Sequence, residues 1–284
     1  MPVSRRKFLQ TSGVLTAAGL LSRNELFAGS AKLKNYGIQL WSVKNALAKD
    51  PKDVLKQIAS FGYTQVESFE GGKGIFWGMT AAEFKKYMDD LGMKIISSHC
   101  NIDKDFEKKA ADAASIGMKY LICPYKGPRK SIDEFKKIAE DFNAKGEICK
   151  KNGIRFAYHN HDYSFVTIDG QVPQDVMLAG TNPDTVDFEM DIYWVVTAGV
   201  DPVAYAEKYK NRFRLCHVKD RIKNTTEKDA SCTLGTGSID YPPMLKKLKA
   251  NGMEYYIVEQ ERYDNTTELD SAKADAKYMS ALSI

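Results

Sequence analysis

The stretch Phe61-Gly62-Tyr63-Thr64-Gln65-Val66 joins an amphipathic segment to a short apolar run through a single glycine. A glycine just beyond a helix takes the left-handed conformation that caps the helix, and the apolar residues behind it return the chain to the core. The same join recurs at Gly92, Gly117, Gly153 and Gly252. Each copy therefore predicts a helix that is followed directly by a strand.

The first four of these glycines are 30, 25 and 36 residues apart, which is the size of a repeated strand and helix unit. Short apolar runs predict eight strands, at 37–40, 64–67, 94–98, 120–123, 155–158, 186–190, 214–218 and 255–258. Helical patterns lie between them at 51–61, 80–91, 132–152, 202–209, 243–250 and 267–282. Eight strands alternating with helices predict an α/β protein with a single-domain (β/α)8 TIM barrel over residues 31–284.

An open, doubly wound sheet is the alternative architecture. Such a sheet is expected to carry a phosphate-binding glycine pattern after its first strand. The segment Gln39-Leu40-Trp41-Ser42-Val43 has none, so the barrel is favoured.

Residues 1–30 differ from the rest of the chain. The run Ser4-Arg5-Arg6-Lys7-Phe8-Leu9 precedes an apolar stretch at 14–21 and small residues at 28–31. This order resembles a twin-arginine export signal, which implies a protein exported to the periplasm. An amphipathic first helix is the alternative.

The charge of the remaining chain argues against a nucleic-acid partner. The full sequence has 41 basic and 37 acidic residues, and removal of residues 1–28 leaves 37 and 36. Nucleic-acid binders concentrate positive charge, whereas this surface is nearly neutral. Beyond residue 30, no apolar run reaches the roughly 18 residues of a spanning helix, so no membrane segment is expected in the mature chain. The five cysteines form no close pair, and we interpret them as buried or neutral thiols, with a disulfide as the alternative.

Histidines and carboxylates follow the predicted strands. In TIM barrels the active site lies at the carboxyl ends of the strands. All four histidines of the chain stand there, namely His99, His159, His161 and His217. Three carboxylates occupy equivalent positions, namely Glu67, Asp191 and Glu259. A single histidine at a strand end is usually structural, but the complete set favours a site for one divalent ion, and the spacing does not choose among Mn²⁺, Zn²⁺ and Co²⁺.

Five motifs in order resemble the xylose-isomerase-like TIM barrels known as sugar phosphate isomerases/epimerases. They are Gly37-Ile38-Gln39-Leu40-Trp41-Ser42-Val43, Tyr158-His159-Asn160-His161-Asp162, Met190-Asp191-Ile192-Tyr193-Trp194, His217-Val218-Lys219-Asp220 and Val258-Glu259-Gln260-Glu261. The resemblance runs from about residue 35 to the C-terminus. It implies one metal held by residues of four consecutive strands, which by motif are His159, Asp191, His217 and Glu259.

Two departures from the family pattern narrow the chemistry. The family usually has Glu-Asn-His where this chain has His159-Asn160-His161, so the matched glutamate pair of the ketose epimerases is missing. One-base proton abstraction beside a polarised carbonyl is still compatible with the remaining residues. Trp194 stands where the endonuclease IV relatives carry a metal-binding histidine, which argues against DNA repair.

The resemblance implies a metal-dependent isomerase or epimerase that removes a proton next to the carbonyl of a keto-sugar. Exported relatives with the His-Asn-His version resemble lyases that release the aglycone of a 3-keto-glycoside, which is the first alternative. A non-catalytic sugar-binding barrel is the second. The oligomeric state is open, a homo-oligomer included.

The expected roles follow from this chemistry. We expect Glu259 or His161 to take the proton. We expect Glu67, His99 and Lys219 to orient hydroxyl groups or protonate the leaving oxygen. The residues expected to contact the sugar are His99, Gln39, Trp41 and Trp194. The pattern Gly235-x-Gly237 is a weak indication of a loop whose backbone approaches a ligand.

Overall fold

The computed structural model describes residues 31–284 and shows a closed barrel of eight parallel strands. The strands are β1 (Gly37–Gln39), β2 (Gln65–Phe69), β3 (Lys94–His99), β4 (Tyr120–Cys123), β5 (Arg155–His159), β6 (Val186–Asp191), β7 (Phe213–Val218) and β10 (Tyr255–Val258). Each strand pairs with its neighbours, and β1 pairs with β10 to close the ring. The predicted (β/α)8 barrel is thereby confirmed. The export signal expected in residues 1–30 lies outside the described residues.

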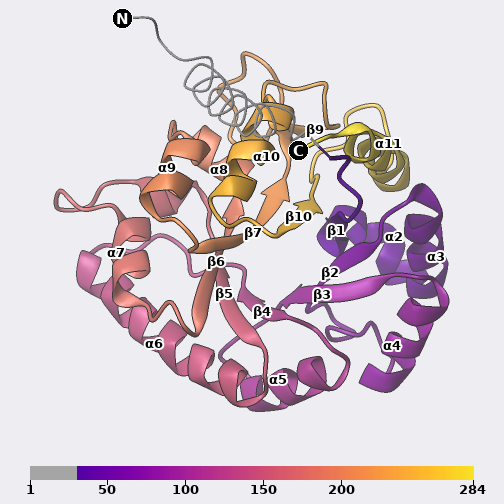
Figure 1. The fold of residues 1–284 in the computed structure, drawn as a ribbon, viewed down its shortest axis with the longest axis horizontal. Coiled ribbons are helices and arrows are strands. Elements are labelled where there is room, and N and C mark those ends of the chain that lie inside the picture. The colour runs from indigo at the N-terminus through magenta and orange to yellow at the C-terminus, as the bar shows by residue number, and fades with distance from the viewer. Residues whose placement is uncertain (1–30) are drawn as a thin grey trace, which may run out of the picture.

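Helices form an outer ring around the strands (Figure 1). They are η1 (Leu40–Val43), α2 (Lys44–Lys49), α3 (Pro51–Phe61), α4 (Ala81–Asp90), α5 (Phe106–Ser115), α6 (Ile132–Lys151), η2 (Asp162–Phe165), α7 (Pro173–Gly180), α8 (Ile192–Thr197), α9 (Pro202–Lys208), α10 (Tyr241–Ala250) and α11 (Glu268–Ala281). A short antiparallel pair, β8 (Asp220–Arg221) with β9 (Ser231–Cys232), lies outside the barrel sheet. Within residues 31–284, no helix combines the length and the apolar character needed to cross a membrane.

Local sequence explains where the helices begin and end. The five glycines that were expected to cap helices all have positive φ, between 69° and 104°. Thr80 and Glu83 form a capping box at the start of α4, and Asp50 accepts the backbone N–H of Asp53 at the start of α3. These terminal groups fix the lengths of the connections between helices and strands.

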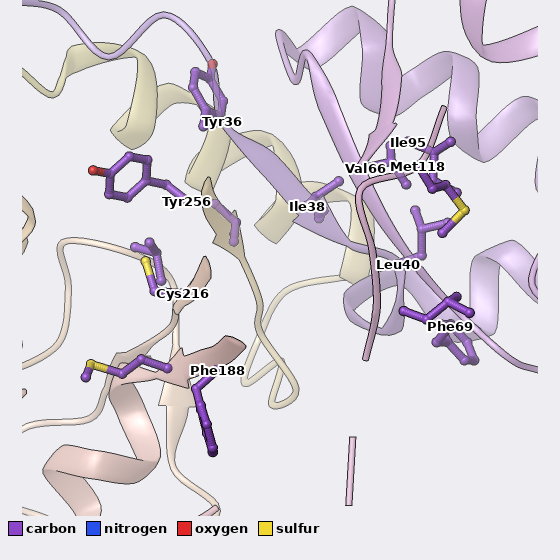
Figure 2. Close-up of a cluster of buried hydrophobic side chains, with 14 of the residues drawn as sticks. Tyr36, Ile38, Leu40, Val66, Phe69, Ile95, Met118, Phe188, Cys216 and Tyr256 are labelled. Atoms are coloured by element: carbon purple, nitrogen blue, oxygen red, sulfur yellow. The ribbon is translucent and has the colours of Figure 1, made fainter. Parts of the chain in front are cut away.

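Outward-facing strand residues pack against the helices. Figure 2 shows part of this core, in which Ile38, Val66, Phe188, Cys216 and Tyr256 belong to five different strands. Burial of each large apolar side chain stabilises the fold by about 1.5–3 kcal/mol. This shell holds the strands in the positions from which their inward side chains meet.

The amino end of the barrel interior is closed by an apolar plug. Tyr120, Ile122, Ala157 and Leu215 form a separate buried cluster, against which Tyr255 packs. Polar side chains replace apolar ones toward the carboxyl ends of the strands, where Glu67, Glu189 and Asp191 are all fully buried. The amino end also holds one buried carboxylate, Asp187, which accepts the Tyr120 hydroxyl (3.1 Å) and forms an ion pair with Arg155. The larger group of buried polar side chains lies at the end where TIM barrels carry their active sites.

The five cysteines are free thiols, as predicted. Four are buried and Cys232 is half-buried. Burial raises the pKa of Cys123 and of Cys149 to about 12, so these thiols stay protonated and unreactive at neutral pH.

Asp275 of α11 is a buried carboxylate that does not line the cavity at the barrel mouth. It is 1% exposed, and its Oδ1 accepts the backbone N–H of Leu234 (2.8 Å). Burial raises the pKa of Asp275 to about 7. The folded chain thus retains a proton that the unfolded chain, with a pKa of about 4, has already released.

We predict that this carboxylate makes stability fall as pH rises. Its contribution is fully present below about pH 4 and is lost as pH rises through about 7. Between pH 5 and pH 8, wild type should lose roughly 2 kcal/mol more unfolding free energy than Asp275→Asn, which keeps an oxygen acceptor for Leu234. Urea unfolding of both proteins at the two pH values measures this difference. Parallel losses in the two proteins would show that Asp275 is not the titrating group.

Candidate metal centre and active site

A cavity of about 490 Å³ opens at the carboxyl ends of the strands. One part of its wall consists of polar and aromatic side chains that lie at or just after the ends of β3, β5, β6 and β10. These are His99, His159, His161, Trp194, Glu259 and Glu261. The opposite wall is formed by residues after β1 to β4, which are Trp41, Phe69, Glu70, Cys100, Asn101, Ile102, Asp103, Cys123, Pro124, Tyr125 and Lys126.

The site has two polar levels because every second residue of a barrel strand faces the interior. The strand register places His159 beside Glu189 and Asp191 beside His217. The lower level contains Glu67, His99 and Glu189. The upper level contains His159, Asp191, His217 and Glu259, here called the ligand group.

The ligand group has the spacing of ligands around one small cation. Donor atoms of Asp191, His217 and Glu259 lie within 4.8 Å of one another. His217 Nδ1 is 3.2 Å from Glu259 Oε2 and 3.8 Å from Asp191 Oδ2. His159 Nε2 is 3.7 Å from the same Asp191 oxygen. Ligands on a tetrahedral ion with bonds of about 2.0–2.1 Å are roughly 3.3 Å apart, so Asp191, His217 and Glu259 could surround one divalent cation. His159 is linked to this set only through its distance to Asp191 and is the fourth candidate ligand.

One atom of the group lacks any hydrogen-bond partner in the described part of the chain. Asp191 Oδ1 accepts the backbone N–H of Trp194 (3.1 Å) and so caps α8. Asp191 Oδ2 is buried without a hydrogen bond. Buried carboxylate oxygens are nearly always hydrogen-bonded. This oxygen faces two imidazole nitrogens and the Lys219 ammonium (4.0 Å), all of them beyond hydrogen-bond distance. A cation between the oxygen and the two imidazole nitrogens would satisfy all three.

Two carboxylates of the lower level, Glu67 and Glu189, orient the histidine ligands and are here called the supporting carboxylates. Glu67 Oε1 is 2.7 Å from His217 Nε2, and Glu189 Oε2 is 3.0 Å from His159 Nδ1. Each contact engages one ring nitrogen and turns the other toward Asp191. Carboxylate, histidine and metal commonly form such a chain in metalloproteins.

A second set of residues could in principle ligate an ion, namely His99, His159, Glu189 and His217. Three ring nitrogens converge there on Glu189 Oε2, at 2.8 Å from His99, 3.0 Å from His159 and 3.3 Å from His217. His99 and His159 form hydrogen bonds to this oxygen, whereas Glu189 Oε1 has none. We therefore assign the lower level to support and the upper level to the cation.

Buried charge dominates the electrostatics of the site. Burial and the Glu67 carboxylate raise the pKa of Glu189 to about 7, whereas His99 and His217 hold the pKa of Glu67 well below its usual range despite its burial. Glu67 raises the pKa of His99 to about 9, against the effect of burial. Lys219 and His217 lower the pKa of Glu259 although that residue is also buried. The cluster thus retains protons to balance its carboxylates, and a divalent cation would displace some of them.

His161 is the histidine that the ligand group leaves free. Burial lowers its pKa to about 4, so the ring is neutral at ordinary pH. Its Nδ1 is buried and has no hydrogen-bond partner among the described residues. The ring stacks on Trp194 (centroids 5.4 Å apart) and meets the edge of Tyr125 (5.1 Å). A fixed, neutral imidazole on the cavity wall is suited to accept a proton.

Lys219 brings a positive charge to the same side of the cavity. It is 1% exposed, forms an ion pair with Glu261, and its Nζ is 3.2 Å from Glu259 Oε2. These carboxylates and Asp191 raise the pKa of Lys219 against the effect of burial, so it stays charged. Its Nζ also lies over the rings of Tyr193 (4.9 Å) and Trp194 (5.2 Å).

The structure gathers most of the residues that the sequence indicated, but three that were expected to act on or contact the substrate do not line the cavity. They are Gln39, Glu67 and Lys219, and Lys219 forms an ion pair with the lining residue Glu261. Glu67 was expected to act on the substrate and Gln39 to contact it, yet both are fully buried and neither lines the cavity. Gln39 Nε2 donates to Glu67 Oε1 (2.7 Å), so Gln39 supports the carboxylate that in turn orients His217.

Three site residues were missed by sequence analysis. Glu189 and Glu261 each stand two positions from a predicted ligand, Asp191 and Glu259, and so face the interior by strand alternation. That period of two was available in the sequence and could have identified them. Tyr125 follows β4 in an irregular segment, and no pattern in the sequence placed it.

The glycines at 235 and 237 serve an internal carboxylate instead of a ligand. Asp220 Oδ2 accepts the backbone N–H groups of Gly235 and Gly237 (both 2.9 Å), and Oδ1 accepts those of Arg221 (2.8 Å) and Ile239 (3.1 Å). A Cβ at Gly237 would lie 2.2 Å from Asp220 Oδ1 and 2.4 Å from the Arg221 carbonyl oxygen. The interpretation of this pattern as a ligand-binding loop is therefore wrong, because Asp220 occupies the space.

Fold and site together define a TIM barrel with a mixed imidazole and carboxylate centre at its mouth. Residues 55–282 match the family model described as Xylose isomerase-like TIM barrel. The chain therefore belongs to the xylose isomerase-like TIM barrel family, a family of sugar-processing isomerases, epimerases and dehydratases. The family expected from the five motifs is confirmed.

Curated relatives include two inosose dehydratases. That of Clostridium perfringens is 28% identical over 146 residues, which cover 46% of this chain and 48% of the relative. That of Lacticaseibacillus casei is 24% identical over 162 residues, which cover 52% of each chain. This chain thus spans about half the length of the curated relatives it matches.

Solved structures share nearly the whole fold. Two sugar phosphate isomerases/epimerases from Parabacteroides distasonis have a TM-score of 0.75 and identities of 30% and 32%. The alignments cover 89% and 87% of this chain and 96% and 97% of those chains. The IolI protein, solved with a bound zinc atom, has a TM-score of 0.70 at 14% sequence identity. The alignment covers 86% of this chain and 95% of the IolI chain, and it shows that the two proteins share a fold.

We predict that Gly237→Ala destabilises the protein by about 1–3 kcal/mol, because the added methyl group overpacks the space around Asp220. Gly72→Ala is the matched control, since a Cβ at Gly72 meets no atom within 4 Å and its φ is not positive. We expect that control to change stability by less than about 0.5 kcal/mol. Thermal unfolding of the two variants measures the difference, and equal midpoints would contradict the packing of this loop.

Proposed function

We propose that this protein is a metal-dependent lyase that removes the proton beside the ketone of a cyclic keto-sugar or keto-polyol and expels a group from the next carbon. The observation that carries the proposal is the asymmetry of the site. The cavity offers one neutral base, His161, and no matched pair of glutamates. The likeness of half the chain to inosose dehydratases supports elimination as the outcome.

The ligand group His159, Asp191, His217 and Glu259 would hold the cation. When bound there, a divalent ion polarises a substrate carbonyl and so acidifies the neighbouring C–H bond. The supporting carboxylates hold the two imidazoles in the orientation this requires. All four ligand side chains are buried, with at most 6% of each residue exposed. Away from water, the charges of these side chains interact strongly with one another.

His161 is the proposed base. His161 lines the cavity, and its Nε2, which is not one of the buried unpartnered atoms, takes the proton from the carbon next to the ketone. The electron pair of that C–H bond forms a double bond to the following carbon, whose bond to the leaving oxygen breaks. The leaving oxygen keeps that bonding pair and gains a proton, so a keto-sugar becomes an enone plus water or an alcohol, without any co-reactant.

Glu261 and Lys219 are the proposed donors to the leaving oxygen. Glu261 lines the cavity, and its partner Lys219 lies directly behind it. The ion pair keeps a proton source beside the ligand group, since Lys219 Nζ is 3.2 Å from Glu259 Oε2. Elimination needs a base and an acid on separate groups, because one proton leaves a carbon atom and the other is added to the leaving oxygen.

The wall of the cavity also indicates an unphosphorylated substrate. Within the described residues, the wall contains no arginine and one lysine, Lys126. Lys126 Nζ is 3.4 Å from both Asp103 and Asp141, so its charge is already balanced. We further infer that the enzyme is exported, because the twin-arginine pattern at Arg5 and Arg6 precedes the barrel.

An isomerase or epimerase is the second candidate, supported by the nearly full-length likeness to the Parabacteroides distasonis proteins. Both reactions begin with the same proton abstraction. They differ in whether the adjacent carbon–oxygen bond breaks.

We predict that Asp191→Asn removes the metal without unfolding the protein, because Asn keeps the acceptor that caps α8 but replaces the second carboxylate oxygen by a weak ligand. Asp201→Asn is the matched control, since Asp201 caps α9 at the surface. Metal analysis after dialysis should find about one ion per chain in wild type and control and a small fraction of that in Asp191→Asn. A full complement in Asp191→Asn would refute the assignment.

We predict that His161→Gln slows turnover by about 10²–10⁴-fold while leaving the metal content unchanged. Incubation with a 3-keto-glucoside or an inosose in deuterated water reports the base, because wash-in of label at one carbon marks proton abstraction. Deuterium incorporation together with release of water or aglycone from the substrate supports the lyase. Deuterium incorporation without such release supports the isomerase. A wild-type rate in His161→Gln would exclude His161 as the base, and a wild type with no wash-in would favour a binding protein.

A further inference from the structure

The cavity is divided into two chemically different halves. The ligand group and His161 belong to β5, β6, β7 and β10 or to the residues after them. The half beside β1 to β4 is largely apolar, with Trp41, Phe69, Ile102, Pro124 and Tyr125 in its wall. A sugar ring whose ketone lies at the ligand group would leave this second half for the substituent that the ring carries.

Two of the side chains in this half are unusually exposed. Trp41 is 38% exposed and Tyr125 is 56% exposed, and they are two of the three large apolar side chains that the described residues leave exposed. Both line the cavity, whereas the third, Val166, does not. Exposed apolar surface gathered in a cleft is typical of a ligand site.

These aromatic rings are held in place before any ligand binds. The Trp41 indole N–H donates to Glu261 Oε1 (3.0 Å), and Phe69 meets Trp41 edge-on with centroids 4.9 Å apart. Tyr125 packs edge-on against Tyr163 (5.3 Å), whose hydroxyl accepts the backbone N–H groups of Lys126 and Gly127 (3.1 Å each). A rigid surface binds a flat group with little loss of side-chain entropy.

The charged side chains that line this half of the cavity are paired with opposite charges. Lys44 Nζ lies over the Trp41 ring (4.0 Å), but Lys44 does not line the cavity. Glu70 is 2.7 Å from Lys109 Nζ and also accepts the backbone N–H of Asn101. Lys126 is shared between Asp103 and Asp141. An ionic ligand would find no unpaired counter-charge among these side chains, so the complementary group is uncharged.

We propose that Trp41, Phe69, Ile102, Pro124 and Tyr125 form a subsite for an uncharged aromatic leaving group, so that the substrates are aryl glycosides whose sugar ring carries a ketone. This inference rests on the proposed elimination. The base takes the proton between the ketone and the anomeric carbon, the bond from the anomeric carbon to the glycosidic oxygen breaks, and that oxygen gains a proton. The products are an enone sugar and a phenol. The bond from Trp41 to Glu261 places the aromatic surface next to the proposed proton donor.

Comparison of aryl and methyl 3-keto-glucosides tests the subsite in the metal-loaded enzyme. We expect wild type to show a kcat/KM about tenfold or more higher for the phenyl than for the methyl compound, after correction for their rates with hydroxide in water. Tyr125→Ala should lower kcat/KM about tenfold more for the phenyl compound than for the methyl compound. The difference between the two compounds is the readout, because Tyr125 also contacts the ring of His161 (5.1 Å) and its loss affects both compounds. Val166→Ala is the matched control, because it removes exposed apolar surface outside the cavity, and it should change neither.

Binding of the unoxidised glucosides gives a readout that needs no turnover, because without the ketone they cannot eliminate. By calorimetry, phenyl glucoside should bind wild type about tenfold more tightly than methyl glucoside, and Tyr125→Ala should abolish that preference. If wild type shows the binding preference but eliminates neither keto-glucoside, the proposed reaction fails and the subsite stands. The opposite result is equal corrected elimination rates for the phenyl and methyl 3-keto-glucosides, together with equal affinities for the phenyl and methyl glucosides. It would overturn the subsite and leave the proposed reaction standing.

Discussion

The structure of the site depends on one electrostatic constraint, which is the burial of four carboxylates at the end of the barrel. Glu67, Glu189, Asp191 and Glu259 are each at most 6% exposed. Such groups must be paired or must bind a cation, since isolated charge is very costly away from water. Glu67 and Glu189 are paired with imidazoles, and Glu259 with Lys219 and His217. Asp191 Oδ2 and Glu189 Oε1 are both buried without a hydrogen bond, and Asp191 Oδ2 has only the Lys219 ammonium 4.0 Å away and two imidazole nitrogens nearby. We propose that the cation binds at Asp191 Oδ2.

The division of labour in the active site follows from the same constraint. Histidines that contact a supporting carboxylate have one nitrogen committed and the other turned to the ligand group, so they are not free to act as bases. His161 contacts none of the carboxylates and is surrounded by aromatic rings, so burial keeps it neutral. Many members of the family resemble epimerases with two opposed glutamates at the substrate carbon. In this chain the proposed groups are instead one imidazole base, His161, and the separate Lys219–Glu261 pair. This arrangement suits elimination better than reversible epimerisation.

The barrel was predictable because its sequence signals are local. The glycine caps and apolar runs gave every strand of the barrel to within two residues at each end, and α3 to the residue. Short helices were missed where the pattern is weak: α5 buries alanines on its inner face, and α8 is built of β-branched and aromatic residues. Asp191 and His217 were identified because each closes an apolar run at the end of a predicted strand. The positions of Tyr125 and of the Asp220 loop depend on irregular backbone. The sequence also could not show that Glu67 lies below the cavity, because depth in a barrel depends on strand register.

The central claim is that His159, Asp191, His217 and Glu259 share a single cation. Anomalous diffraction from crystals of the protein loaded with Mn²⁺, Co²⁺ or Zn²⁺ tests this most directly, because the scattering peak locates the ion independently of turnover. We predict one strong peak per chain within about 2.0–2.3 Å of atoms from these four side chains, including Nε2 of His159 and Nδ1 of His217. A peak beside His99 and Glu189, or no peak at the barrel mouth, would contradict the account.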